Sequence, residues 1–188
     1  MSKIRIKNVI KKAVLVLLLF WGSASFFLFV SHDLVKLLIL VLSLLSLYFI
    51  FSSSGEFILL LFLNFINLYA FYGLLFTYNL PLYLVMIGLV LMSGSTFYIL
   101  GRKMISSSNF NLYILFFIIL ILEIYLTLSY WLINPLTRSF IVAIFIYLFY
   151  GFITSTESQK FENKSFTSYI YITIIVLLVL IFTISWGH

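Results

Sequence analysis

The chain has 188 residues and a net charge of +6; 64% of its residues are hydrophobic and only 9% are charged. Soluble domains average about 45–50% apolar and about 25% charged residues, so this composition excludes an ordinary soluble domain. The chain contains no cysteine, which excludes disulfides, thiolate nucleophiles and thiolate metal ligands.

Seven apolar stretches follow one another along the chain, each about as long as a helix that crosses a hydrocarbon core roughly 30 Å thick. Helix is the expected form, because a hydrocarbon core offers no water to unpaired backbone groups. We predict an all-α fold, a polytopic membrane helix bundle that forms a single domain over residues 1–188. The expected transmembrane helices are 13–31, 34–52, 56–77, 80–101, 111–133, 135–154 and 167–187.

Local signals mark the starts of several spans. Ser53 and Glu56 have the spacing of a capping box, in which each side chain bonds a backbone amide of the first turn. Proline is tolerated in a first helical turn, as expected for Pro135 directly after Asn134. Asp33 and Lys36 are three residues apart and can pair on a helix.

The basic residues follow the topology of the predicted spans. Nine of the eleven fall before the first span or in the loops after the fourth and sixth: Lys3, Arg5, Lys7, Lys11, Lys12, Arg102, Lys103, Lys160 and Lys164. Because positive residues stay cytoplasmic during insertion, we predict a cytoplasmic N-terminus, an outside C-terminus and a multi-pass protein of the cell membrane. Lys3, Arg5, Lys7, Lys11 and Lys12 of the basic segment 1–12 are expected to lie near anionic headgroups, and no nucleic-acid partner is expected.

Two clusters of small residues predict close helix contacts. They are residues 22–25, midway along the first span, and residues 93–96, in the fourth. Backbones can approach at small side chains, and hydroxyls can bond across helices. We favour packing as the role of both clusters, and cavity lining is the alternative.

Glu123 is the one charged residue near the middle of a predicted span. A carboxyl group there costs roughly 2.5–3.5 kcal/mol on insertion scales, so we expect it to face the bundle interior. At helical spacing Glu123, Thr127, Tyr130 and Asn134 share one face and form a polar stripe that runs toward the outer surface. The stripe could lock helices together through hydrogen bonds, or it could bind a ligand, a cation or a proton.

Asn64 and Asn67 are a second polar pair, near the middle of the 56–77 span. Amide groups at this depth require hydrogen-bond partners. We hypothesise that this span faces the 111–133 span and that Glu123 bonds one of the two amides. The candidate ligand- or ion-binding residues are therefore Glu123, Thr127, Tyr130, Asn134, Asn64 and Asn67.

Catalytic groups do not gather in this sequence. His32 and His188 are its only histidines, and neither has an acidic or thiol cluster beside it. The motifs of metalloproteases, serine hydrolases and phosphate-binding loops are missing. We therefore expect no enzyme activity, no catalytic residue, no metal ligand and no cofactor.

Two functions remain after these exclusions. The favoured one is a non-enzymatic subunit or scaffold of a membrane assembly, which acts through helix–helix contacts with a membrane protein partner. The alternative is a transport component that binds a small solute, proton or cation on an outward-open polar stripe centred on Glu123. The first is preferred because this acid has no second charged group in the core with which to couple.

Overall fold

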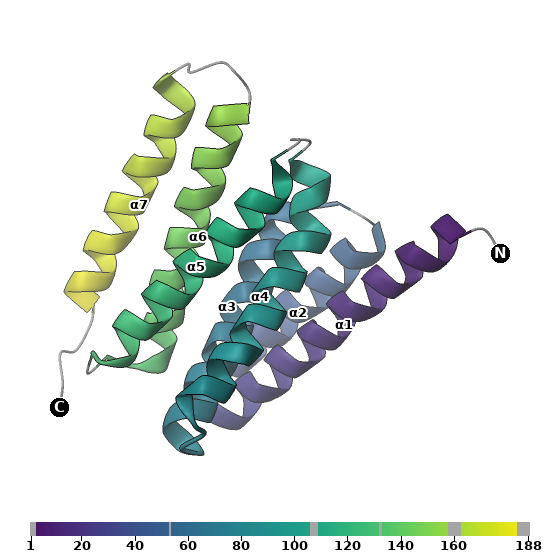
Figure 1. Ribbon diagram of the computed structural model, residues 1–188. Helices are drawn as coiled ribbons and strands as arrows, with labels where there is room; N and C mark the ends of the chain where they lie inside the picture. The colour runs from purple at the N-terminus through teal and green to yellow at the C-terminus, as the bar shows by residue number, and fades with distance from the viewer. Residues whose placement is uncertain (1–2, 53, 106–108, 132, 158–162, 184–188) are drawn as a thin grey trace. The chain divides into compact units, whose positions relative to one another are not determined.

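The computed structural model describes residues 3–52, 54–105, 109–131, 133–157 and 163–183. Regular structure in these ranges is all helical, which confirms the predicted fold class (Figure 1). The helices are α1 (Lys3–Phe29), α2 (Asp33–Ser52), α3 (Glu56–Thr77), α4 (Leu82–Met104), α5 (Phe110–Ser129), α6 (Pro135–Glu157) and α7 (Asn163–Thr183).

Contacts divide the chain into two compact units, each of which is described by itself. Unit 1 is Met1–Met104 and holds α1 to α4, and unit 2 is Ile105–His188 and holds α5 to α7. The single domain expected over residues 1–188 stays a prediction.

Six helices of the described chain are long and apolar enough to cross a membrane, so the protein is a multi-pass helical membrane protein. The apolar segment described in α7, Thr167–Val176, is shorter. The seventh span therefore stays a prediction, and its residues 184–187 lie outside the described ranges. The six spans are Asn8–Phe29, Asp33–Ser52, Glu56–Thr77, Leu82–Arg102, Phe110–Ser129 and Pro135–Thr156.

The helix ends show where hydropathy misplaced a boundary. α1 begins at Lys3, so the basic segment that we placed before the first span forms its first turns. α3 begins at Glu56 as expected, but its N-cap is Gly55, in the left-handed region at a φ of 66° and without a side-chain hydrogen bond. Glu56 is therefore the first residue of α3 rather than the third, and Ser53, the other residue of the predicted capping box, lies outside the described residues.

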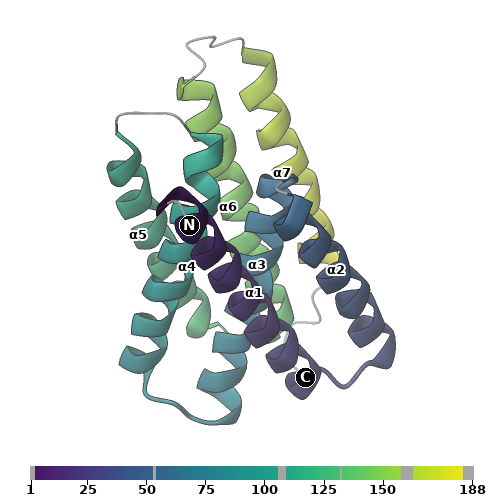
Figure 2. The same cartoon turned by 90° about the vertical axis from the view of Figure 1, so that its right-hand side faces the viewer.

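Helix α3 is the centre of unit 1, since it contacts α1, α2 and α4. Figure 2 shows α1 between α2 and α4, both of which it also contacts. About 72% of the apolar window of α3 is buried, against 17% for α2. Because lipid is as apolar as leucine, such helices associate through close packing and hydrogen bonds rather than through the hydrophobic effect.

Close approach between α1 and α3 depends on two glycines. A Cβ atom on Gly22 would lie 2.6 Å from Cγ1 of Ile66, and one on Gly73 would overlap the ring of Phe29. Beside Gly22, the hydroxyl oxygens of Ser23 and Ser43 are 2.8 Å apart and join α1 to α2. The packing role favoured for residues 22–25 is confirmed at Gly22 and Ser23, whereas Ala24 is exposed.

In unit 2, α6 contacts both α5 and α7. The rings of Phe117 in α5 and Phe149 in α6 have centroids 5.7 Å apart. On the α7 side, the rings of Tyr147 and Tyr169 are 4.8 Å apart, and a Cβ atom on Gly151 would lie 2.5 Å from the Tyr169 ring. Aromatic packing therefore holds α6 to both of its neighbours.

The α1–α3 contact can be tested with a matched pair of leucines. Gly22→Leu should destabilise the folded protein by about 1–3 kcal/mol, because the new side chain must displace Ile66. Ala24→Leu, at an exposed position of the same helix, is the control. Thermal unfolding in detergent should show a lower midpoint for Gly22→Leu alone. Equal midpoints for the two variants would contradict close packing at Gly22.

Candidate functional site

Helix α5 buries one face and exposes the other. Its buried residues include Phe117, Ile121, Tyr125 and Leu128. Glu123 is two residues, about 200° of helical rotation, from both Ile121 and Tyr125, so it lies opposite the buried face. Its side chain is exposed on α5. The expectation that Glu123 faces the interior of the seven-helix bundle stays a prediction, because α5 lies in one of two units that are described separately.

Thr127 and Tyr130 share the exposed face with Glu123, so this part of the predicted stripe has the expected register. Tyr130 is 79% exposed, just past the end of α5. The hydroxyl of Thr127 donates to the backbone carbonyl of Glu123 at 2.8 Å, a bond within one helix. The hydroxyl proton of Thr127 is thus engaged in a hydrogen bond within α5. The carboxyl of Glu123 is the strongest polar group on this face.

Asn134 does not belong to the stripe, which corrects the sequence-based assignment. α5 ends at Ser129, not at residue 133, so the helical register does not reach Asn134. Asn134 instead caps α6: its Oδ1 accepts the backbone N–H of Leu136 at 2.9 Å, and Pro135 is the first helical residue. The buried side chain of Arg138, in α6, donates to the backbone carbonyl of Trp131, which follows the end of α5.

Asn64 and Asn67 are buried in α3, only 2% and 4% exposed. Each Nδ2 donates to a carbonyl of the same helix, Asn64 to Leu60 at 2.9 Å and Asn67 to Leu63 at 2.7 Å. The Oδ1 of Asn67 is buried and has no hydrogen-bond partner among the described residues. The hypothesis that Glu123 bonds one of these amides stays a prediction, because α3 and α5 belong to different units.

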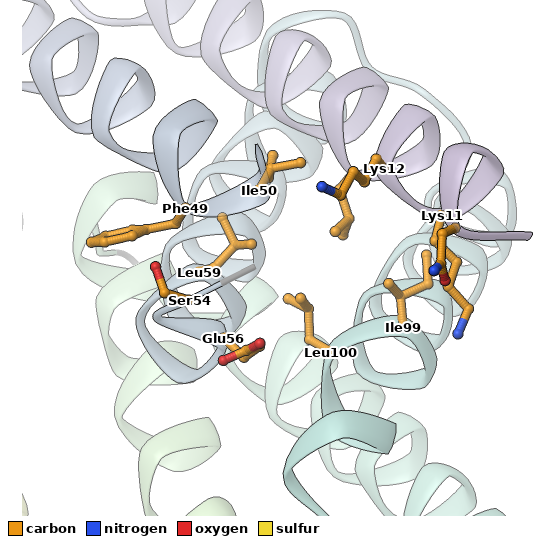
Figure 3. A pocket seen from close by; sticks show the side chains of 11 residues that line it. Lys11, Lys12, Phe49, Ile50, Ser54, Glu56, Leu59, Ile99 and Leu100 are labelled. Atoms are coloured by element: carbon orange, nitrogen blue, oxygen red, sulfur yellow. The ribbon is translucent and has the colours of Figure 1, made fainter. Parts of the chain in front are cut away.

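The sequence analysis missed a cavity at one end of unit 1. It has a volume of about 200 Å³ and receives side chains from all four helices of that unit (Figure 3). Asn8, Lys11, Lys12 and Leu15 of α1 line it at positions i, i+3, i+4 and i+7. This change from polar to apolar residues along one helical face is the signal that could have indicated the site. Among the residues that the structure describes, no three His, Cys, Asp or Glu side chains are grouped so that they could hold a metal ion.

Comparisons of the chain with protein-family models, with curated proteins and with solved structures find no match. The class of the protein rests instead on its own helices, which define a multi-pass helical membrane protein.

The capping role of Asn134 has a direct test. Asn134→Ala should lower the free energy of unfolding by about 1 kcal/mol, because the N–H of Leu136 loses its acceptor. Asn134→Ser should restore most of the loss, since serine also caps helices. Thermal unfolding in detergent measures both variants. If Asn134→Ala leaves the midpoint unchanged, the cap contributes nothing to stability.

Proposed function

We propose that this protein is a non-enzymatic subunit of a membrane assembly and that it binds a helix of another membrane protein along the exposed face of α5. The supporting observation is the exposed carboxyl of Glu123 within a membrane-spanning helix. An acid in contact with lipid at that depth costs roughly 2.5–3.5 kcal/mol. A partner helix that offers a hydrogen-bond donor or a cation removes this cost.

The rest of the face fits such a contact. Leu112, Phe116 and Ile119 precede Glu123 on the same side of α5, and all three are exposed. Large apolar side chains can face lipid or protein equally well, so they do not by themselves require a partner. Glu123 does favour a partner, because lipid tails offer its carboxyl no hydrogen bond and a partner helix can supply one.

The proposed orientation places the N-terminus in the cytoplasm. Among the described cations of unit 1, Lys11 and Lys12 lie near the start of α1 and Arg102 lies near the end of α4. Lys36, at the opposite helix ends, pairs with Asp33 at 3.3 Å, as predicted from their spacing. Lys36 is the one cation at these helix ends among the described residues of unit 1, and this unequal distribution of Lys and Arg supports the orientation by the positive-inside rule.

The alternative, a transport component, needs the Glu123 stripe to border a water-filled path. Thr127 already bonds its own helix, and the cavity in unit 1 is lined by residues other than Glu123, Thr127 and Tyr130. The subunit proposal requires only a lateral contact, so it is the one we prefer.

Site-specific photo-crosslinking tests the proposal in native membranes. A photoreactive residue at Ile119, on the exposed face of α5, should give one protein adduct of defined size. The same residue at Leu38, an exposed position of α2, is the control and should give lipid adducts only. Glu123→Leu should reduce the Ile119 adduct about tenfold or more, because removing one partner of a buried polar pair costs about 2 kcal/mol or more.

The variant Glu123→Gln distinguishes a partner that offers a neutral hydrogen-bond donor from one that offers a cation. Glutamine keeps hydrogen bonding without charge, so a donor partner should retain most of the adduct and a cationic partner should lose it. An adduct at Ile119 that persists unchanged in Glu123→Leu, or lipid adducts alone at Ile119, would contradict the proposal.

A further inference from the structure

The cavity of unit 1 has a polar rim and an apolar floor. Asn8 and Ser54 are exposed and Lys11, Lys12 and Glu56 are half-buried, whereas five apolar lining residues are buried. Figure 3 shows Lys12 extending from α1 toward the middle of the cavity, Lys11 of the same helix beside Ile99, and Glu56, the first residue of α3, on the side opposite Lys11. The buried floor residues come from all four helices: Leu15, Ile50, Leu59, Ile99 and Leu100.

The rim lies where the apolar spans of unit 1 begin and end. The α1 span begins at Asn8, the α2 span ends at Ser52, the α3 span begins at Glu56 and the α4 span ends at Arg102. These positions correspond to the headgroup region of a bilayer, and the floor lies toward the hydrocarbon. A molecule in this cavity therefore meets cations at its polar end and aliphatic side chains at its other end.

Charge at the rim favours an anion. The lining contains two lysines and one glutamate, so its side chains carry a net positive charge at neutral pH. The Nζ of Lys12 donates to the carbonyl of Phe51 at 2.9 Å and lies 5.8 Å from the centroid of its ring. An ammonium group has three N–H donors, so this bond leaves Lys12 with further donors while it holds the side chain at the cavity.

The volume limits what can enter. A cavity of about 200 Å³ is smaller than the roughly 300–1,000 Å³ of typical small-molecule sites, so it does not hold a whole lipid. A phosphate group with the carbons next to it fits this space, while the acyl chains remain in the bilayer.

From this geometry we propose that the cavity is a discrete binding site for the headgroup phosphate of an anionic glycerophospholipid. The phosphate lies between Lys11 and Lys12, and the adjoining carbons contact Leu15 and Leu59. This goes beyond the diffuse attraction that we expected along the basic segment 1–12, because it assigns one lipid to one cavity. It is independent of the partner proposed for α5, which belongs to unit 2.

Lipid titrations on the full chain in detergent, followed by native mass spectrometry, test this site. Phosphatidylglycerol should give one saturable adduct, and phosphatidylcholine should give none at the same concentration. Lys11→Gln and Lys12→Gln should each weaken the phosphatidylglycerol adduct about fivefold at low salt. Glu56→Gln should have the opposite effect and strengthen it, since it removes the negative charge at the rim.

Arg102→Gln is the matched control, because Arg102 is an exposed cation at the same end of unit 1 but does not line the cavity. It should leave the adduct within about twofold of wild type. Circular dichroism in detergent confirms that each variant remains helical. Equal losses in Arg102→Gln and Lys12→Gln, or equal binding of both lipids, would overturn the discrete site. Competition by soluble glycerol phosphate at the concentration at which the lipid binds would overturn its assignment to a lipid.

Discussion

The exclusion of water from between the helices is the constraint on which the packing of this protein depends. In hydrocarbon, burying a leucine against another helix gains little, so association requires backbones that approach closely and polar groups that are bonded. Gly22 and Gly73 provide the approach between α1 and α3. The amide nitrogens of Asn64 and Asn67 meet the second requirement locally, since each donates to a carbonyl of its own helix. Close approach at Gly22 and Gly73 accounts for the packing of α3 against α1.

Hydropathy predicted the helices well where a polar residue coincides with a helix end. The expected span 56–77 agrees with α3, which begins at Glu56 and ends at Thr77. It failed at the end of α5, because Trp131 and Ile133 continue the apolar run after the helix has stopped at Ser129. A hydrophobic turn and a hydrophobic helix have the same composition, so only hydrogen bonds, such as the cap at Asn134, distinguish them.

Helical periodicity identified which residues share a face but not what that face meets. Glu123 and Thr127 lie on one side of α5 as predicted, yet only the packing of α5 against α6 shows that the side with Ile121 and Tyr125 is buried. The cavity in unit 1 was harder to foresee, because its lining comes from three separate stretches of the sequence, 8–15, 49–59 and 99–100. Spacing within α1 could indicate its contribution, but only tertiary packing brings Leu100 beside Leu15.

The link between α1 and α2 has a consequence for biogenesis. Residues 30–32 alone join Phe29 to Asp33, and three residues extend over only about 10 Å, far less than a bilayer. Helices α1 and α2 therefore cross the membrane as an antiparallel hairpin, and the hydrogen bond between Ser23 and Ser43 joins its two arms. Because a ribosome delivers the N-terminal part first, the residues of α1 around Gly22 are synthesised before α3, the helix that packs against them.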